Sequence, residues 1–116
     1  MSTALEPFRA LAAEPHAYLT TIGRRSGEPH EIEIWWAFVD GVVYMISGGG
    51  DASDWVRNLQ AEPTAAIRVG DTSIAVRARF ELTDDERTSA GGALAGKYRP
   101  GESSWRDGFL VAYDGR

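Results

Sequence analysis

The chain has 116 residues, of which 43% are hydrophobic, 25% charged and 10% aromatic. This size and balance fit one globular domain over residues 1–116 and leave no room for a second. No apolar run approaches the roughly 20 residues of a membrane helix, and the lack of a secretory leader predicts a cytoplasmic protein. The net charge of −5 argues against nucleic-acid binding. With no cysteine and two histidines, we expect no disulfide, no thiol nucleophile and no metal site.

Short apolar runs between glycine-containing turns indicate many short strands and few helices. The expected elements are, in chain order, a helix at 3–13, strands at 18–22, 30–38 and 42–47, a helix at 55–61, strands at 64–69 and 72–82, a helix from 84 to about 98 and a strand at 109–113. Ser53 or Asp54 is expected to cap the second helix and Asp84 the third. This order predicts a mainly β (α+β) fold, a small antiparallel barrel with short helices at its ends.

Two neighbouring tryptophans stand in the predicted strand 30–38, which alternates apolar and polar residues. Successive side chains of a strand point to opposite faces, so Trp35 and Trp36 are expected to point apart. Trp36 falls on the same face as Ile34, and one of the two rings can fill the barrel in this interpretation. The other ring then lies at a dimer interface or under a ligand, and we favour a homodimer.

The first candidate for chemistry is the turn Gly23-Arg24-Arg25-Ser26-Gly27. Guanidinium groups, a hydroxyl and the N–H groups of a tight turn can together bind an anion. The alternative is a solvated hairpin whose charged residues have no ligand. The local sequence leaves both interpretations open.

The second candidate is Ser47-Gly48-Gly49-Gly50, which leads into the helix at 55–61. Glycines let a ligand approach the backbone, and a helix N-terminus favours phosphate. In that helix Trp55 and Asn58 share a face, so Trp55 could stack on a planar ring and Asn58 could hydrogen-bond to it. The alternatives are a flexible connection and a tryptophan buried in the core.

Other catalytic arrangements are not supported. His30 and Glu31 point to opposite faces of their strand, and Glu33 lies with Glu31, so these residues do not converge on a metal. Neither histidine stands in a recognisable nucleophile context. We therefore expect that a bound cofactor supplies the chemistry if the protein is an enzyme.

Three segments together resemble the deazaflavin-dependent nitroreductase and quinone reductase family. They are LTTIGRRSGEPHEIEI, SGGGDASDWVRNLQAEP and GKYRP, in the family's order and at similar spacing. The resemblance covers residues 18–98 and implies a split β-barrel related to the flavin-binding pyridoxamine-oxidase barrels. It also implies the cofactor F420, a deazaflavin with a phosphate and an oligoglutamate tail. The reduced cofactor gives hydride to a quinone, a nitro compound or another activated acceptor such as an enone.

The resemblance also implies roles for individual residues. His30 stands where many relatives have arginine, so its contact would depend on pH, and Glu31 and Glu33 would repel an anionic tail if they faced it. Tyr98 would give a proton or a hydrogen bond to the acceptor. The residues expected to bind the cofactor are Arg24, Arg25, Ser26, Gly27, His30, Ser47, Gly48, Gly49, Trp55 and Asn58.

Two other functions remain open at this point. An FMN-binding barrel could use the same loops, because FMN also carries a phosphate and a stacking ring. A barrel that binds a cofactor, haem or lipid-like molecule without turnover would need no acid–base residues. Each function predicts a small-molecule ligand and no nucleic acid.

Overall fold

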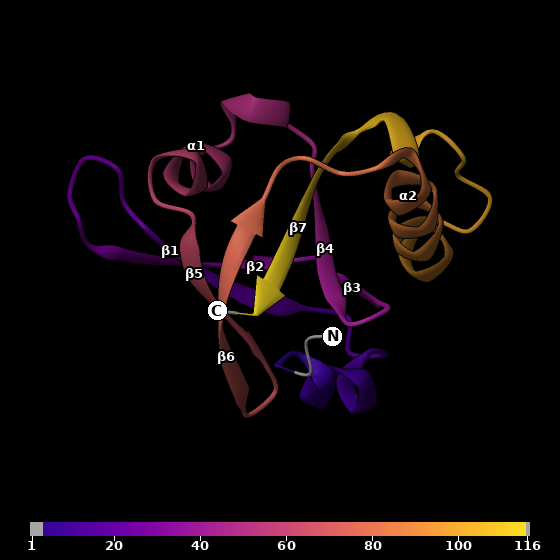
Figure 1. Cartoon of the computed structure of the whole chain (residues 1–116), viewed down its shortest axis with the longest axis horizontal. Helices are drawn as coiled ribbons and strands as arrows, with labels where there is room; N and C mark the ends of the chain where they lie inside the picture. The colour runs from indigo at the N-terminus through magenta and orange to yellow at the C-terminus, as the bar shows by residue number, and fades with distance from the viewer. Residues whose placement is uncertain (1–3, 116) are drawn as a thin grey trace.

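The computed structural model describes residues 4–115. Within that range the chain forms one antiparallel sheet of seven strands with two α-helices and three short 3-10 helices (Figure 1). The elements are η1 Glu6–Leu11, β1 Ala17–Ile22, β2 Pro29–Ile34, β3 Ala37–Val39, β4 Val42–Ser47, η2 Gly50–Ala52, α1 Asp54–Ala61, β5 Thr64–Val69, β6 Thr72–Arg79, α2 Asp84–Tyr98, η3 Trp105–Asp107 and β7 Phe109–Gly115. The mainly β antiparallel architecture is therefore as predicted.

The strand order shows that the sheet curls into an open barrel. The order is β2-β1-β5-β6-β7-β4-β3, so β2 and β3 stand at opposite edges although they follow each other in the chain. Three Cα–Cα steps from Ile34 to Ala37 reach at most about 11 Å. The two edges must therefore lie close together at this point, which gives the sheet its curl.

This crossing corrects the prediction of one continuous strand over residues 30–38. The chain leaves the ladder at Trp35 and Trp36 because β2 pairs with β1, whereas β3 pairs with β4. The two rings do separate as expected. Trp36 is fully buried and donates from Nε1 to the carbonyl of Glu14 at 2.9 Å, whereas Trp35 is 38% exposed.

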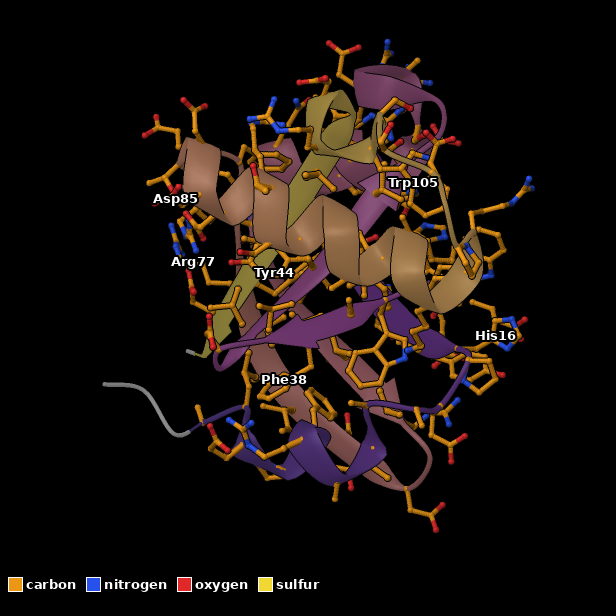
Figure 2. All side chains as sticks on the ribbon, turned by 90° about the vertical axis from the view of Figure 1, so that its right-hand side faces the viewer. His16, Phe38, Tyr44, Arg77, Asp85 and Trp105 are labelled. Carbon is orange, nitrogen blue, oxygen red and sulfur yellow. The ribbon has the colours of Figure 1, made fainter. Side chains whose placement is uncertain are left out.

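Alternating side chains build two apolar layers. On β4, Val43 and Met45 point into the barrel, while Tyr44 points the other way, under α2. Figure 2 shows α2 lying across the strands with Tyr44 beneath it. Gly91 lets α2 pack closely against η3, because a Cβ at this position would lie 2.6 Å from the backbone nitrogen of Arg106.

Several predicted boundaries need correction. Thr83, not Asp84, caps α2. Its hydroxyl accepts from the backbone N–H of Glu86, and the Glu86 carboxylate accepts from the backbone N–H of Thr83. No side chain caps α1. The strand predicted at 72–82 ends at Arg79. The Arg79 guanidinium donates to the Glu81 carbonyl and to the Glu86 carboxylate, so the chain turns here towards the start of α2.

The N-terminal segment is shorter than predicted. The helix expected at 3–13 is a 3-10 helix, Glu6–Leu11, and residue 3 lies outside the described residues. Phe8 is buried and packs edge-on against Trp36, with ring centroids 5.7 Å apart. Among residues 4–115 no helix combines the length and the apolar character that a bilayer crossing requires.

Candidate anion-binding site

A surface pocket of about 340 Å³ opens between the β1–β2 loop and the first turn of α1. It brings together five residues of the loop region and two of the helix: Gly23, Arg24, Arg25, Ser26, His30, Asp54 and Asn58. The loop closes tightly, because the Gly23 N–H donates to Glu28 and the Gly27 N–H donates to Gly23, each at 2.8 Å. Gly27 has φ +71°, a conformation that favours glycine.

Asn58 ties the loop to the helix. Its side-chain oxygen accepts from the backbone N–H of Arg24 at 3.2 Å and from Nη1 of the same residue at 2.8 Å. Its amide nitrogen donates to Thr21 at 3.1 Å. Asn58 is only 6% exposed, and both the oxygen and the nitrogen of its amide are hydrogen-bonded within the protein. Asn58 thus shapes the pocket wall.

The two arginines differ in what holds them. Arg24 is tied to α1, because it also donates from Nη2 to the Asp54 carboxylate at 3.1 Å. Arg25 makes no hydrogen bond, ion pair or ring contact within the part of the chain that the structure describes. Its guanidinium therefore brings an uncompensated positive charge to the pocket, where it can meet an anion.

Ser26 and His30 form the opposite wall. The Ser26 hydroxyl lies 3.3 Å from Nε2 of His30 and accepts from the N–H of Glu28 at 3.1 Å. A Cβ on Gly23 would lie 2.6 Å from both Ser26 Oγ and His30 Nε2, so these two side chains would have to move to admit one. His30, which stands where many relatives have arginine, therefore lines the pocket beside the loop.

The start of α1 adds backbone donors. Ser53 occupies the N-cap position, but its hydroxyl bonds to Ser47 Oγ at 2.7 Å instead of the helix N–H groups. The N–H groups of the first turn are consequently left for solvent or an anion. Asp54 places one negative charge here, and the two arginines outweigh it.

The glycine-rich turn and Trp55 do not reach this pocket. Ser47 is buried and donates to the Gly50 carbonyl at 2.8 Å, which folds the turn that contains Gly48 and Gly49. The turn sets the start of α1 and does not line the pocket. Trp55 is half-buried and packs against the barrel core.

Tyr98 also lies outside the pocket. Its hydroxyl donates to the Pro15 carbonyl at 2.7 Å and accepts from the Trp36 N–H at 3.0 Å. Burial raises the pKa of this phenol. Its ring stacks on Trp35, with centroids 4.5 Å apart and planes 5° from parallel. In this structure the Tyr98 hydroxyl joins the N-terminal segment to the link between β2 and β3.

The two glutamates of β2 have partners away from the pocket. Glu31 lies 3.8 Å from Arg68, and Glu33 accepts from the Tyr18 hydroxyl at 2.9 Å. Neither lines the pocket, so neither faces an anion bound there. Within residues 4–115 no three His, Asp or Glu side chains gather in a way that would hold a metal ion.

Two pocket residues were not among those expected to bind the cofactor. Gly23 belongs to the turn that the sequence singled out, but its packing against His30 across the loop is not visible in the local sequence. Asp54 was considered only as a helix cap. Its pairing with Arg24 joins residues 30 positions apart, which no local pattern reveals.

Comparison with known proteins places this geometry in a family. The model of the F420H2-dependent quinone reductase family matches residues 3–97, and the chain belongs to this family. No curated protein matches the sequence. A solved F420H2-dependent reductase, FDR-A, is 27% identical, with a TM-score of 0.67 over 86% of this chain and 92% of its own.

Two further structures share the fold. The conserved hypothetical protein Rv2991 from Mycobacterium tuberculosis is 21% identical, with a TM-score of 0.73 over 97% of this chain and 78% of its own. A structure described as a domain-swapped dimer is 23% identical, with a TM-score of 0.70 over 94% of both chains. The expected split barrel and the expected class, an F420-dependent reductase, are both confirmed.

The pocket fits the anionic part of F420. The fit rests on the Arg25 guanidinium, which has no partner among residues 4–115, on His30 in the pocket wall and on the uncapped start of α1. Together these groups offer charge and N–H donors of the kind that phosphate selects. When bound, the reduced deazaflavin supplies hydride.

Proposed function

We propose that this reductase passes hydride to a small activated acceptor, with a quinone as the principal class and nitro compounds and enones as related ones. The pocket at the β1–β2 loop holds the anionic group of the cofactor in this proposal. The observation that carries the assignment is Arg25, whose guanidinium has no partner among the described residues. The family match supports the acceptor class.

Each pocket residue has a distinct part in the proposal. Arg25 meets the anion directly, and Ser26 and the first N–H groups of α1 add hydrogen bonds. Arg24 and Asn58 hold the loop against the helix, which fixes these donors in place. His30 lines the pocket beside Ser26 and can offer a ring nitrogen to the bound group.

The test is a binding titration of the purified protein with F420 and, separately, with FMN. We expect tighter binding of F420, and Arg25→Gln should weaken it about tenfold, since a charge-assisted contact contributes about 1.5 kcal/mol or more. Arg77→Gln is the matched control. Arg77 is an exposed arginine of β6 outside the pocket, so its removal should leave F420 binding unchanged (Figure 2).

Two outcomes would contradict the assignment. If Arg25→Gln and Arg77→Gln bind F420 equally well, the anion is not held at the β1–β2 loop. If FMN binds tightly and F420 weakly, the barrel belongs with flavin-binding proteins in its choice of cofactor.

We also infer that the protein is a homodimer. The free edge of β2 and the exposed Ile22, 36% accessible at the end of β1, support this proposal, as does the dimeric structure that shares the fold. Sedimentation equilibrium should give twice the chain mass at micromolar concentration. The mass of one chain at every concentration would rule the dimer out.

A further inference from the structure

A second pocket lies at the other end of β2 and is built for a different ligand. It has a volume of about 310 Å³ and is lined by His16, Glu33, Ile34, Trp35 and Ile46. Three of the five side chains are apolar, and no lysine or arginine lines it among the described residues. Its size is at the lower limit of ordinary small-molecule sites. Such a pocket suits a small, flat and uncharged molecule.

Trp35 gives this pocket a rigid aromatic wall. Its ring stacks on Tyr98, and Trp105 lies at an angle of 34°, with centroids 6.3 Å apart. The two hydrogen bonds of the Tyr98 hydroxyl fix the supporting ring in turn. The exposed part of Trp35 is thus preorganised for stacking on another planar ring.

A titratable pair stands beside the wall. Nε2 of His16 lies 3.5 Å from one carboxylate oxygen of Glu33, and the other oxygen accepts from Tyr18 at 2.9 Å. The Glu33 carboxylate is therefore held between the Tyr18 hydroxyl and the His16 ring. With Nε2 turned to Glu33, Nδ1 is the nitrogen that can donate to a ligand. Figure 2 shows His16 on the surface, away from Asp85 at the start of α2.

The two pockets are close enough to serve one reaction. His30 lines the first and Ile34 the second, four residues apart on β2. At about 3.3 Å per residue the separation is about 13 Å along the strand. A cofactor whose anionic group lies in the first pocket can therefore reach an acceptor held in the second.

We propose that a quinone-class acceptor stacks on Trp35 and that His16, oriented by Glu33, donates the proton that completes its reduction. This proposal rests on the proposed function. Reduction of a quinone to a hydroquinone takes up one hydride, which carries two electrons, and one proton. The hydride comes from the reduced deazaflavin, which is oxidised. The proton passes from Nδ1 of His16 to a quinone oxygen, and the imidazole regains a proton from water.

The stacking claim is tested by equilibrium dialysis of the protein with menadione alone and, separately, with F420 alone. Trp35→Leu should weaken menadione binding at least tenfold, while Trp35→Phe should stay within about threefold because it keeps a ring for stacking. Neither change should alter F420 binding. Arg77→Gln, at an exposed position of β6 outside both pockets, is the control.

The proton claim is tested by chemical rescue of turnover. His16→Ala should lower kcat with menadione at least tenfold, within the range usual for loss of a general acid. Free imidazole in the buffer should restore much of the loss, which a merely structural defect would not allow. His30→Ala should raise the KM for the reduced cofactor and gain nothing from imidazole.

The outcomes separate this proposal from the proposed function. If F420 binds and supports turnover but Trp35→Leu leaves menadione binding unchanged, the second pocket is not the acceptor site. If His16→Ala keeps the full kcat, or imidazole fails to rescue it, the proton comes from elsewhere. If menadione binding depends on Trp35 while F420 does not bind, this pocket stands and the proposed function fails.

Discussion

Asn58 shows how one residue positions the site at the residue scale. Its amide accepts two bonds from Arg24 and donates one to Thr21, and it is nearly fully buried. Removing it leaves the Arg24 N–H and the Thr21 hydroxyl without this partner. Buried groups that lose a partner cost about 1–3 kcal/mol.

We therefore expect Asn58→Ala to lower the free energy of unfolding by about 2 kcal/mol in urea denaturation. Loss of loop order should also weaken F420 binding. Asn58→Asp keeps the oxygen that Arg24 uses and loses the donation to Thr21, so it should fall between alanine and wild type in stability. Equal stability of Asn58→Ala and wild type would contradict this role.

The residue scale also shows what sequence can and cannot reveal. The spacing put Asn58 on one helix face with Trp55 and suggested a hydrogen bond to a ligand. The structure instead buries Asn58 against Arg24 and Thr21, which lie 34 and 37 residues earlier in the chain. The same holds for the two arginines. The motif could not separate Arg24, which is tied to α1, from Arg25, which makes no hydrogen bond or ion pair with residues 4–115.

At the scale of elements, α2 is anchored at its start by a charged network. Arg79 of β6 pairs with Glu86 at 2.8 Å and with Asp114 of β7 at 2.9 Å, and the Tyr44 hydroxyl donates to Glu86 at 2.8 Å. The hydrogen bonds from Arg79 lower the pKa of the Glu86 carboxyl to about 2. One carboxylate therefore ties α2 to strands β4 and β6.

This network makes stability depend on pH. Because the pKa of Glu86 is lower in the folded than in the unfolded protein, its contribution is complete above the unfolded value of about 4.3 and is lost as pH falls towards 2. Glu86→Gln should lower the free energy of unfolding by about 2 kcal/mol at pH 7. The gap to wild type should shrink between pH 5 and pH 2. A gap that is constant across this range in urea titrations would contradict the assignment.

Local sequence patterns predicted most helices and strands, but not the points at which one strand ends and the next pairs with a different neighbour. Alternation correctly predicted the part of β2 from His30 to Ile34, and the strand predicted at 42–47 is β4. The same alternation continues through Trp35 and Trp36, where the ladder breaks. That break depends on which strands pair across the sheet, and this is a property of the whole barrel.

The whole molecule is acidic yet presents a cationic pocket. The net charge of −5 would repel an anionic cofactor at long range. However, the carboxylates of β2 have partners away from this pocket, whereas Arg25 has none in the described part of the chain. The curl of the sheet then places this loop and the Trp35 pocket at the two ends of one strand.

Oxidation of reduced F420 by menadione, followed through the absorbance of the oxidised cofactor, tests the central claim most directly. The wild-type protein should turn over with reduced F420 and not with reduced FMN. Arg25→Gln should raise the KM for reduced F420 about tenfold and leave kcat within twofold, because the contact binds the cofactor without entering the chemistry. Turnover with reduced FMN alone, or an Arg25→Gln enzyme with unchanged KM, would contradict the account.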